Sequence, residues 1–349
     1  MEQLVLLVEG KLKEIFDEER KRSTCHQFQA ECIDIMEKFV MGPGKRLRPL
    51  SLLLFFIGGG GKIEEQKNII RTACAMELLH DSTLAHDDIM DEDETRRNAP
   101  TIVKTFYDKY IERNKEDVKT EKFLFISRGT TYASSLAIMT GNILYSMAQQ
   151  LCLESGTNVA EMLLELFSVL NYGQILDMSG LNTVEEYNLN IIMKTAIFFK
   201  TTAAIGLTLA GRSEHDIELG KEWGEHFGIA FQMRDDLLDI DPLNGKLRKM
   251  GSDIKEGKKT AVVWTALKEG VLGKEEKEFV EGILKLNEKA FDNQEAFTKF
   301  LNILRGKPSE IVRQEIKEHH QKALDALKQL QLKEDGFSSL KQITDLLLH

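Results

Sequence analysis

The chain has 349 residues, of which 42% are hydrophobic, 29% are charged and 5 are prolines, so it is neither a disordered nor a fibrous protein. Its 46 lysines and arginines are outnumbered by 56 aspartates and glutamates, which gives a formal net charge of -10. This acidic balance argues against a general nucleic-acid-binding protein. An anionic ligand would therefore need local basic side chains or bound cations.

The cysteines and the N-terminus predict the compartment. The 4 cysteines show no CxxC or CxxH spacing, so we interpret them as small apolar side chains in a reducing environment. No apolar run approaches the roughly 20 residues of a membrane helix, and residues 1–8 lack the basic region and the length of a signal peptide. We expect a soluble, cytoplasmic protein without a transmembrane segment.

The predicted elements are nearly all helical, because apolar residues recur at spacings of three and four and strict alternation is hard to find. Two amphipathic helices precede the Gly42-Pro43-Gly44 break, and a short apolar helix over 47–57 ends at the glycine run 58–61. The long helices that follow are predicted at about 64–91, 130–153, 158–180, 183–211 and 214–241.

Three stretches separate the predicted helices: a charged loop at 92–100, a polar surface excursion at 108–122, and a mobile loop rich in Gly and Lys at 242–259. Four further helices are expected to carry the chain to Leu348. Since no linker or tandem repeat is evident, we expect one all-α domain over residues 1–349.

Two DDxxD clusters stand out, and each ends a predicted apolar helix. Asp87, Asp88 and Asp91 form the first, and Asp235, Asp236 and Asp239 form the second. The outer aspartates of each cluster are four residues apart and share a helix face. Crowded carboxylates at a helix C-terminus repel one another and oppose the macrodipole. A solvated acidic surface would explain one such cluster, but two of them favour sites for divalent cations.

Magnesium suits these clusters better than calcium does. Mg²⁺ takes a few carboxylates together with waters and substrate phosphate oxygens, and the spacing of a calcium-binding EF-hand loop is absent from the sequence. Basic residues lie close to both clusters along the chain: the segment GKRLRP at 44–49 opens a helix, Arg96-Arg97 follows the first cluster, and the loop after the second carries Lys249, Lys258 and Lys259. The pattern predicts two diphosphate sites, one bridged by metal and one held directly by basic side chains.

With these motifs, the chain resembles the trans-isoprenyl diphosphate synthases, a family that includes farnesyl, geranylgeranyl and longer polyprenyl diphosphate synthases. The shared motifs, in chain order, are GKRLRP, DDxxD with RR, Gly173-Gln174 with Asp177, Lys194-Thr195, Phe231-Gln232 before the second DDxxD, and the Lys249, Asp253 and Lys258 loop. The resemblance implies a single helical bundle around a deep central cavity and a homodimer. It also implies condensation of isopentenyl diphosphate with an allylic diphosphate to give a trans-polyprenyl diphosphate.

The resemblance also implies a role for each matching residue. A cluster of Mg²⁺, three ions in number, would be held by Asp87, Asp88, Asp91, Asp235 and Asp239. The allylic diphosphate would contact Arg96, Lys194, Lys249 and Lys258, and isopentenyl diphosphate would contact Lys45, Arg48, His80 and Arg97. Oxygen dipoles near the allylic cation would come from Thr195 and Gln232 with Lys194, and supporting contacts from Gln174, Asp177 and Asp236.

The chemistry agrees with this assignment. Ionisation of an allylic diphosphate places negative charge on the leaving group, which cations stabilise, and positive charge on carbon, which preorganised oxygen dipoles stabilise. No side-chain nucleophile is required, and His86 is interpreted as a supporting or packing residue. Three features depart from the family pattern, namely Asn98, Asn142 and the stretch 108–128, which looks like an insertion, and none falls on a metal or phosphate position.

Product length is predicted from the helix that precedes the first cluster. Family members with short products carry an aromatic residue four or five positions before the first Asp, where this chain has the small residues Thr83 and Ser82. Leu79 and Met76 lie about one and two turns deeper, each turn being roughly 5.4 Å. We expect a product of twenty carbons or more and a shorter one from Ser82→Phe, unless another helix supplies the floor of the tunnel.

Three alternatives remain open at this stage. A farnesyl diphosphate synthase would share every motif above. A class I terpene cyclase would have a second metal motif of mixed Asn/Asp, Ser/Thr and Glu, whereas this chain repeats DDxxD. A non-catalytic subunit of a heteromeric synthase would typically lose one aspartate cluster or the basic residues, and both are intact here.

Overall fold

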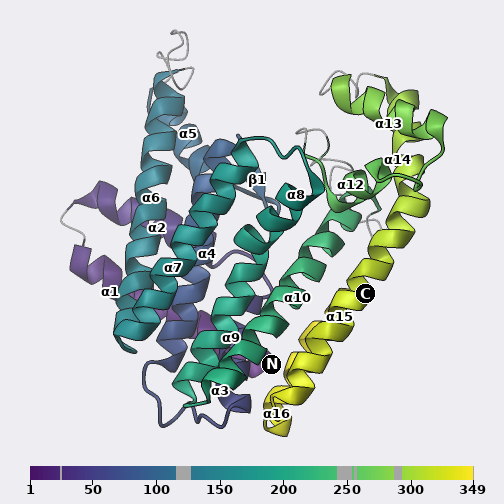
Figure 1. Cartoon of the computed structure of the whole chain (residues 1–349). Coiled ribbons are helices and arrows are strands. Elements are labelled where there is room, and N and C mark those ends of the chain that lie inside the picture. Colours follow the sequence, from purple (N-terminus) through teal and green to yellow (C-terminus); the bar gives the residue numbers. More distant parts are fainter. Residues whose placement is uncertain (24–25, 115–126, 242–253, 255–257, 287–292, 349) are drawn as a thin grey trace. The chain divides into compact units, whose positions relative to one another are not determined.

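The computed structural model describes residues 1–23, 26–114, 127–241, 254, 258–286 and 293–348, and these are almost entirely helical, as predicted. They form two compact units (Figure 1). Unit 1 contains Met1–Phe167 and Leu209–Gly211, and unit 2 contains Ser168–Thr208 and Arg212–His349. A single domain over the whole chain stays a prediction.

Unit 1 holds the first aspartate cluster at the end of a largely buried helix, α4. Its elements are α1 (Glu2–Ser23), α2 (Gln27–Val40), α3 (Leu47–Gly58), α4 (Ile69–Met90), β1 (Thr95–Arg96), β2 (Ala99–Pro100), α5 (Ile102–Arg113), α6 (Arg128–Leu153) and the larger part of α7 (Thr157–Met178). Helix α6 begins at a capping box in which the Ser127 hydroxyl accepts from the Thr130 N–H. Helix α4 packs along α6, and both are buried over much of their length.

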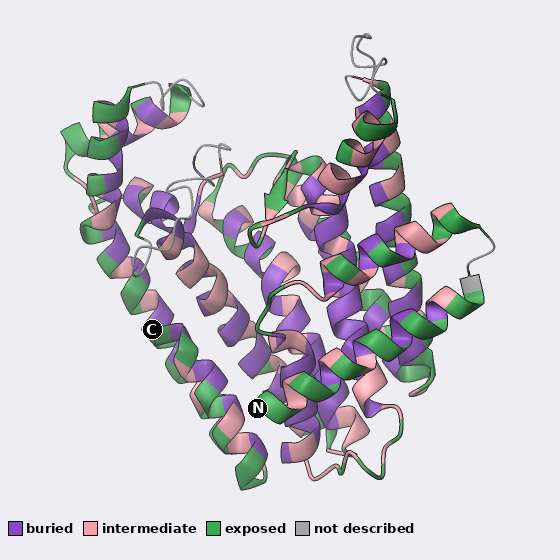
Figure 2. Cartoon of the chain, turned by 180° about the vertical axis from the view of Figure 1, so that it is seen from behind, coloured by how far each residue is buried: buried purple, intermediate pink, exposed green. Residues whose placement is uncertain are grey.

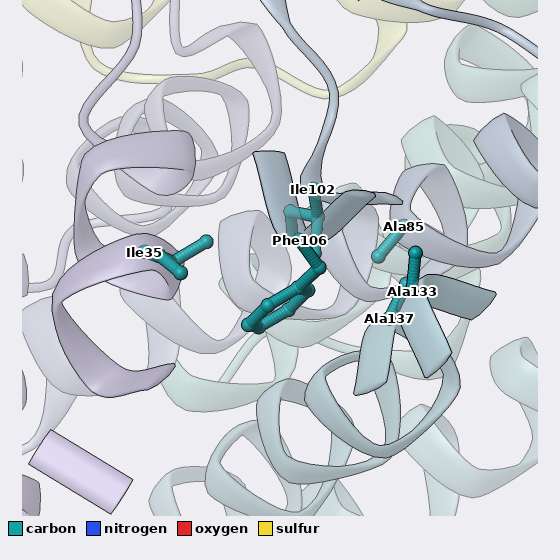
Figure 3. Packing of buried hydrophobic residues seen from close by; sticks show 6 residues of the cluster. All are labelled: Ile35, Ala85, Ile102, Phe106, Ala133 and Ala137. Carbon is teal, nitrogen blue, oxygen red and sulfur yellow. The ribbon is translucent and has the colours of Figure 1, made fainter. Parts of the chain in front are cut away.

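Small side chains let these helices approach closely beneath the first aspartate cluster. Figure 3 shows Phe106 of α5 among Ile35 of α2, Ala85 of α4 and two alanines of α6. Gly141 of α6 faces α4 as well, because a Cβ there would lie 2.4 Å from Nε2 of His86. His86 therefore packs against α6 and faces the Ile138 carbonyl oxygen at 3.3 Å, in agreement with its interpretation as a packing residue.

The predicted charged loop contains a small hairpin. Strands β1 and β2 pair Thr95 with Pro100 and Arg96 with Ala99, and the two residues between them have positive φ, 52° at Arg97 and 62° at Asn98. Two-residue hairpins favour positive φ at both positions, and Asn tolerates this conformation better than most residues. Asn98, which departs from the family pattern, is thus a suitable residue for this two-residue turn.

Unit 2 holds the second cluster at the end of its longest helix. Its elements are the last part of α7, then α8 (Val184–Ile191), the π-helical turn η1 (Ile192–Ala196), α9 (Ile197–Leu209, its last residue in unit 1), α10 (Glu214–Ile240), α12 (Ala261–Leu267), α13 (Lys274–Leu286), α14 (Gln294–Arg305), α15 (Lys307–Gln329), α16 (Glu334–Asp345) and η4 (Leu346–Leu348). Helices α10 and α15 run side by side in Figure 1. Figure 2 shows α15 with buried residues along one side and exposed residues along the other.

Three glycines of α10, spaced by four residues, bring it against η1 and α9 with almost no space between the backbones. A Cβ at Gly228 would lie 2.3 Å from the Ala196 Cα, and one at Gly224 would lie 2.4 Å from the Lys200 N. The buried rings of Phe199, Trp223 and Phe227 pack beside this contact. The close approach fixes η1 against α10.

Several predicted boundaries were wrong. The helix predicted at 183–211 is interrupted by the π-turn, whose extra residue per turn shifts the side-chain pattern. Residues 108–113 belong to α5, so only the later part of the predicted insertion lies outside a described helix. Among the described residues after 260 there are five α-helices rather than four, since α12 is a short element of its own. The predicted loop at 242–259 falls largely outside the described residues.

The lengths and compositions of the helices bear on the expectation that the chain has no transmembrane segment. Two helices are long and apolar enough to cross a membrane by length and composition: Thr157–Met178, with 33% of its most apolar window buried, and Val184–Leu209, with 67% buried. Core helices of globular proteins share these properties, so neither helix identifies a membrane span.

Candidate active site

Helix α4 presents two stripes of functional side chains in unit 1. Asp87, Thr83, His80 and Met76 follow one stripe at helical spacing, and Asp88, Leu84, Asp81 and Glu77 follow the adjacent one. Asp87 and Asp91 are partly exposed, whereas Asp88 has no exposed surface. Asp91, the last residue of the cluster, is the C-cap of α4, and its N–H donates to the Asp87 carbonyl at 2.8 Å.

Asp88 is held by the hairpin. Nε of Arg96 donates to its Oδ1 at 2.6 Å, while its Oδ2 is buried and has no hydrogen-bond partner among the described residues. Burial raises the pKa of Asp88 to about 6, although the Arg96 charge opposes the shift. Arg96 also lies 3.5 Å from Asp93. The predicted diphosphate contact Arg96 is thus paired with a predicted metal ligand in this structure.

The residues predicted to bind isopentenyl diphosphate gather in unit 1. A Cβ on Gly44 would lie 3.5 Å from Nη1 of Arg97, which places the hairpin next to the GKRLRP segment. Burial, followed by the charges of Arg48 and Arg97, holds the pKa of His80 well below its usual value, so the ring is neutral. Burial also lowers the pKa of Arg48 to about 10. Lys45 is exposed at the start of the segment.

Two acidic residues of this group were missed by the sequence analysis. Glu77 accepts from Nη1 of Arg46 at 2.8 Å in a buried ion pair, so Arg46 anchors the segment to α4. Asp81 is buried 4.0 Å from Nη1 of Arg97, and neither of its oxygens has a hydrogen-bond partner in the described part of the chain. Burial and the Glu77 charge raise the pKa of Asp81 well above its usual value.

The predicted chain-length residues have different surroundings. Ser82 is buried, and its hydroxyl donates to the Gly141 carbonyl of α6 at 2.8 Å. Thr83 is partly exposed and bonds the His80 carbonyl of its own helix. Leu79 and Met76 have no exposed surface. Of these four residues, Thr83 and Met76 share the stripe of Asp87.

In unit 2, the π-turn carries Lys194 and Thr195 (Figure 1, between α8 and α9). Nζ of Lys194 donates to Oδ2 of Asp177 at 2.7 Å. A Cβ on Gly173 of α7 would lie 2.9 Å from Cγ of Lys194, so the glycine leaves room for this side chain. The predicted pair Gly173-Gln174 thus lies beside the predicted lysine, with Gln174 half-buried.

A chain of hydrogen bonds joins the π-turn to the second aspartate cluster. Thr195 Oγ1 donates to Oε1 of Gln232 at 2.9 Å, and Nε2 of Gln232 donates to Oδ1 of Asp236 at 3.0 Å. Oδ2 of Asp236 accepts from the Tyr187 hydroxyl at 2.6 Å and from the Ala261 N–H at 2.7 Å. Asp236 is therefore a buried anchor, and Tyr187 was missed by the sequence analysis.

The remaining residues of the second cluster lie on the last turn of α10. Asp235 is half-buried, and Asp239 is buried four residues further on. Lys258 is half-buried just before α12. The neighbouring Lys259 donates to the Leu181 carbonyl at 3.1 Å and lies over the Trp264 ring. The predicted contact Lys249 lies outside the described residues.

These donors fit magnesium. Each cluster offers carboxylate oxygens, and the buried Oδ2 of Asp88 has no hydrogen-bond partner in the part of unit 1 that the structure describes. Among the described residues, no group of three His, Cys, Asp or Glu side chains is close enough to hold a metal ion by itself. Mg²⁺ is commonly bound by a few carboxylates with waters and substrate phosphates, so such an open donor set suits it.

Comparison with known proteins agrees with the motifs. A family model described as polyprenyl synthetase matches residues 29–304. This chain belongs to the polyprenyl synthetase family. It is 30% identical over 305 residues to a geranylgeranyl diphosphate synthase of Sulfolobus acidocaldarius, an alignment that covers 84% of this chain and 82% of that protein.

Two solved structures show the same all-α fold. The geranylgeranyl pyrophosphate synthase from Corynebacterium glutamicum, complexed with isoprenyl diphosphate and magnesium, matches with a TM-score of 0.85 and 21% identity, covering 99% of this chain and 98% of that one. A polyprenyl synthase from Caulobacter crescentus, complexed with calcium and isoprenyl diphosphate, matches with a TM-score of 0.76 and 22% identity, covering 99% and 97%. Family and sequence relatives together identify this polyprenyl synthetase as a prenyltransferase that elongates trans-prenyl chains.

Proposed function

We propose that the chain condenses isopentenyl diphosphate head-to-tail with an allylic diphosphate in a magnesium-dependent reaction. The observation that carries this proposal is the pair of stripes on α4. One stripe ends in the partly exposed Asp87, and the other lies beside the basic residues Arg48 and Arg97. A metal-bridged diphosphate and a directly bound diphosphate need these two environments.

The allylic diphosphate would be bound through both aspartate clusters. The ligands of Mg²⁺ would be Asp87, Asp88, Asp91, Asp235 and Asp239, and relatives solved with magnesium or calcium support a divalent cation. When bound, the metal neutralises the leaving diphosphate. Direct contacts would come from Arg96, Lys194, Lys249 and Lys258. Asp177 holds Lys194 in place for this contact.

Isopentenyl diphosphate would be held by Lys45, Arg48, His80 and Arg97. His80 is neutral in this basic surrounding, so it can donate one hydrogen bond to a phosphate oxygen without adding charge. The two guanidinium groups match phosphate oxygens with pairs of N–H donors. This binding orients the alkene against the allylic carbon and supplies the entropic part of the rate enhancement.

The allylic cation would be stabilised by oxygen dipoles of the π-turn and α10. The hydroxyl of Thr195 donates to Gln232, which leaves lone pairs of Thr195 Oγ1 to face positive charge. After the new carbon–carbon bond forms, the proton lost from the isopentenyl unit passes to the released diphosphate. No basic side chain of the chain is needed for this step.

We propose a product of twenty carbons or more, as in the geranylgeranyl diphosphate synthase relatives. Thr83, on the stripe of Asp87, is the small residue that leaves room for the growing chain. A farnesyl diphosphate product is the alternative. A cytoplasmic location stays a prediction.

We also propose a homodimer. Exposed apolar side chains gather at helical spacing on α6, where they are Ile138, Met139 and Ile143. On α7, Tyr172, Ile175 and Met178 are each 64–67% exposed. Exposed apolar surface of this kind marks an interaction site, and we propose a second copy of the chain as the partner that covers it.

The purified chain should be incubated with isopentenyl diphosphate, Mg²⁺ and dimethylallyl, geranyl or farnesyl diphosphate as primer. We expect chain elongation, with geranylgeranyl diphosphate or a longer product separated by chromatography. Farnesyl diphosphate as the sole terminal product would contradict the proposed length. Inactivity with every primer would favour a non-catalytic subunit.

A further inference from the structure

Tyr187 of α8 lies outside every family motif quoted above, yet its hydroxyl makes a short hydrogen bond inside the second aspartate cluster. It donates to Oδ2 of Asp236 at 2.6 Å, and both side chains are buried. The Ala261 N–H at the start of α12 donates to the same oxygen at 2.7 Å. These two donors hold one oxygen of Asp236 and leave the other, Oδ1, for Gln232.

This arrangement fixes the orientation of the Gln232 amide. An ionised carboxylate can only accept, so the group of Gln232 that meets Asp236 must be its NH₂. The Gln232 carbonyl oxygen is then the atom that faces Thr195, at 2.9 Å. If Asp236 rotated away, the amide could flip and present NH₂ to Thr195. A flipped amide would donate to Thr195 Oγ1 and occupy a lone pair that is proposed to face the allylic cation.

We infer that Tyr187 is a positioning residue for the condensation, acting through Asp236 on the orientation of the Gln232 and Thr195 dipoles. The inference rests on the proposed function, because it concerns the stabilisation of the allylic cation. Tyr187 touches no substrate in this scheme. The Tyr187 hydroxyl keeps Asp236 in an orientation in which it accepts from the Gln232 NH₂. The Gln232 carbonyl oxygen then accepts from Thr195, which leaves the lone pairs of Thr195 Oγ1 to face the cation.

Such a role affects the transition state more than the bound substrates. Both diphosphates are held by metal and basic side chains, whereas the dipoles of Gln232 and Thr195 meet full positive charge only when the allylic bond breaks. Loss of the Tyr187 hydroxyl should therefore lower kcat and leave the KM values nearly unchanged. If the hydroxyl served only to join α8 to α10, its loss would instead lower the free energy of unfolding.

The test is a double-mutant cycle with Tyr187→Phe and Gln232→Met, and with Tyr107→Phe as the matched control on α5. We expect Tyr187→Phe to lower kcat about tenfold, less than the roughly 10²–10³-fold loss typical of a directly acting dipole, with both KM values within about twofold. Tyr107→Phe should behave as the wild type. In the Gln232→Met background, Tyr187→Phe should cause no further loss, because its effect passes through Gln232.

A wild-type kcat in Tyr187→Phe, or an equal tenfold loss in both backgrounds, would overturn the inference. If Tyr187→Phe lowers the thermal unfolding midpoint by more than a few degrees, Asp236→Asn takes its place in the same cycle. This variant puts an NH₂ in place of one acceptor oxygen of Asp236 and so disrupts the same hydrogen bonds. Failure of the wild type and of Tyr107→Phe to elongate any primer would instead contradict the proposed function itself.

Discussion

Ser82 and Thr83 are adjacent small residues, but the structure gives them different neighbours. A phenylalanine at position 82 would meet the α6 backbone, because the Ser82 hydroxyl already lies 2.8 Å from the Gly141 carbonyl. Thr83 faces along the stripe that ends at Asp87. From the sequence, both positions were predicted to leave room for the growing product. Spacing along a helix does not show which of its faces a neighbouring helix covers.

Thr83→Phe should shorten the terminal product, and Ser82→Phe should instead destabilise the chain by about 1–3 kcal/mol through overpacking. Chromatography of the dephosphorylated products and urea unfolding check both outcomes. Thr83→Ser is the matched control and should retain the product length of the wild type. An unchanged product from a folded Thr83→Phe variant would show that another element sets the length.

The buried carboxylate of Asp88 destabilises the folded chain when it is ionised. Its folded-state pKa of about 6 lies above the ordinary value of 3.8, so the folded chain binds this proton more tightly than the unfolded chain does. Its contribution to stability is therefore fully present below the ordinary pKa and is lost as the pH rises through about 6. The shift reflects burial more than the opposing charge of Arg96.

Asp88→Asn should accordingly raise the free energy of unfolding at pH 7, without metal, by on the order of 1–3 kcal/mol. The gain should shrink at pH 5, where the wild-type carboxyl is largely protonated. Turnover should fall because a predicted metal ligand is lost. Urea titrations at both pH values in the presence of a chelator measure the effect, and a variant less stable than the wild type at pH 7 would contradict it.

At the scale of elements, the glycine contacts of α10 hold the π-turn. The sequence analysis predicted one continuous helix through Lys194 and Thr195, because the π-turn contains no Gly or Pro that would signal a break. It also missed Tyr187, whose partner Asp236 is 49 positions away. The helices themselves and the residues of the two clusters followed from local periodicity and spacing.

Gly228→Ala should push α10 away from η1, because its Cβ would lie 2.3 Å from the Ala196 Cα. We expect a loss of at least 1–3 kcal/mol, roughly the cost of overpacking, together with lower kcat. Gly282→Ala on α13 is the matched control, since nothing lies within 4 Å of its Cβ, and helix propensity should stabilise it by up to about 1 kcal/mol. Thermal unfolding of both variants decides the point. A Gly228→Ala variant as stable as Gly282→Ala would rule out the close contact.

At the scale of the whole molecule, the exposed apolar residues of α6 and α7 predict self-association. Ile175→Glu should weaken the dimer, because it places a charge in apolar surface that a second copy would cover. Leu6→Glu on α1, a residue 62% exposed, is the matched control. Sedimentation equilibrium of the two variants compares the dissociation constants, and equal values would contradict the proposed interface.

Both aspartate clusters are proposed to bind magnesium for one reaction. The most direct test of this proposal is to measure the rate of chain elongation as a function of Mg²⁺ concentration. The variants are Asp87→Asn, Asp235→Asn and, as an exposed control, Asp17→Asn. Each cluster variant should lose turnover by at least about 10²-fold and need more Mg²⁺ for half-maximal rate, and Asp17→Asn should match the wild type. Turnover that persists under chelation, or that survives loss of either cluster, would contradict the account.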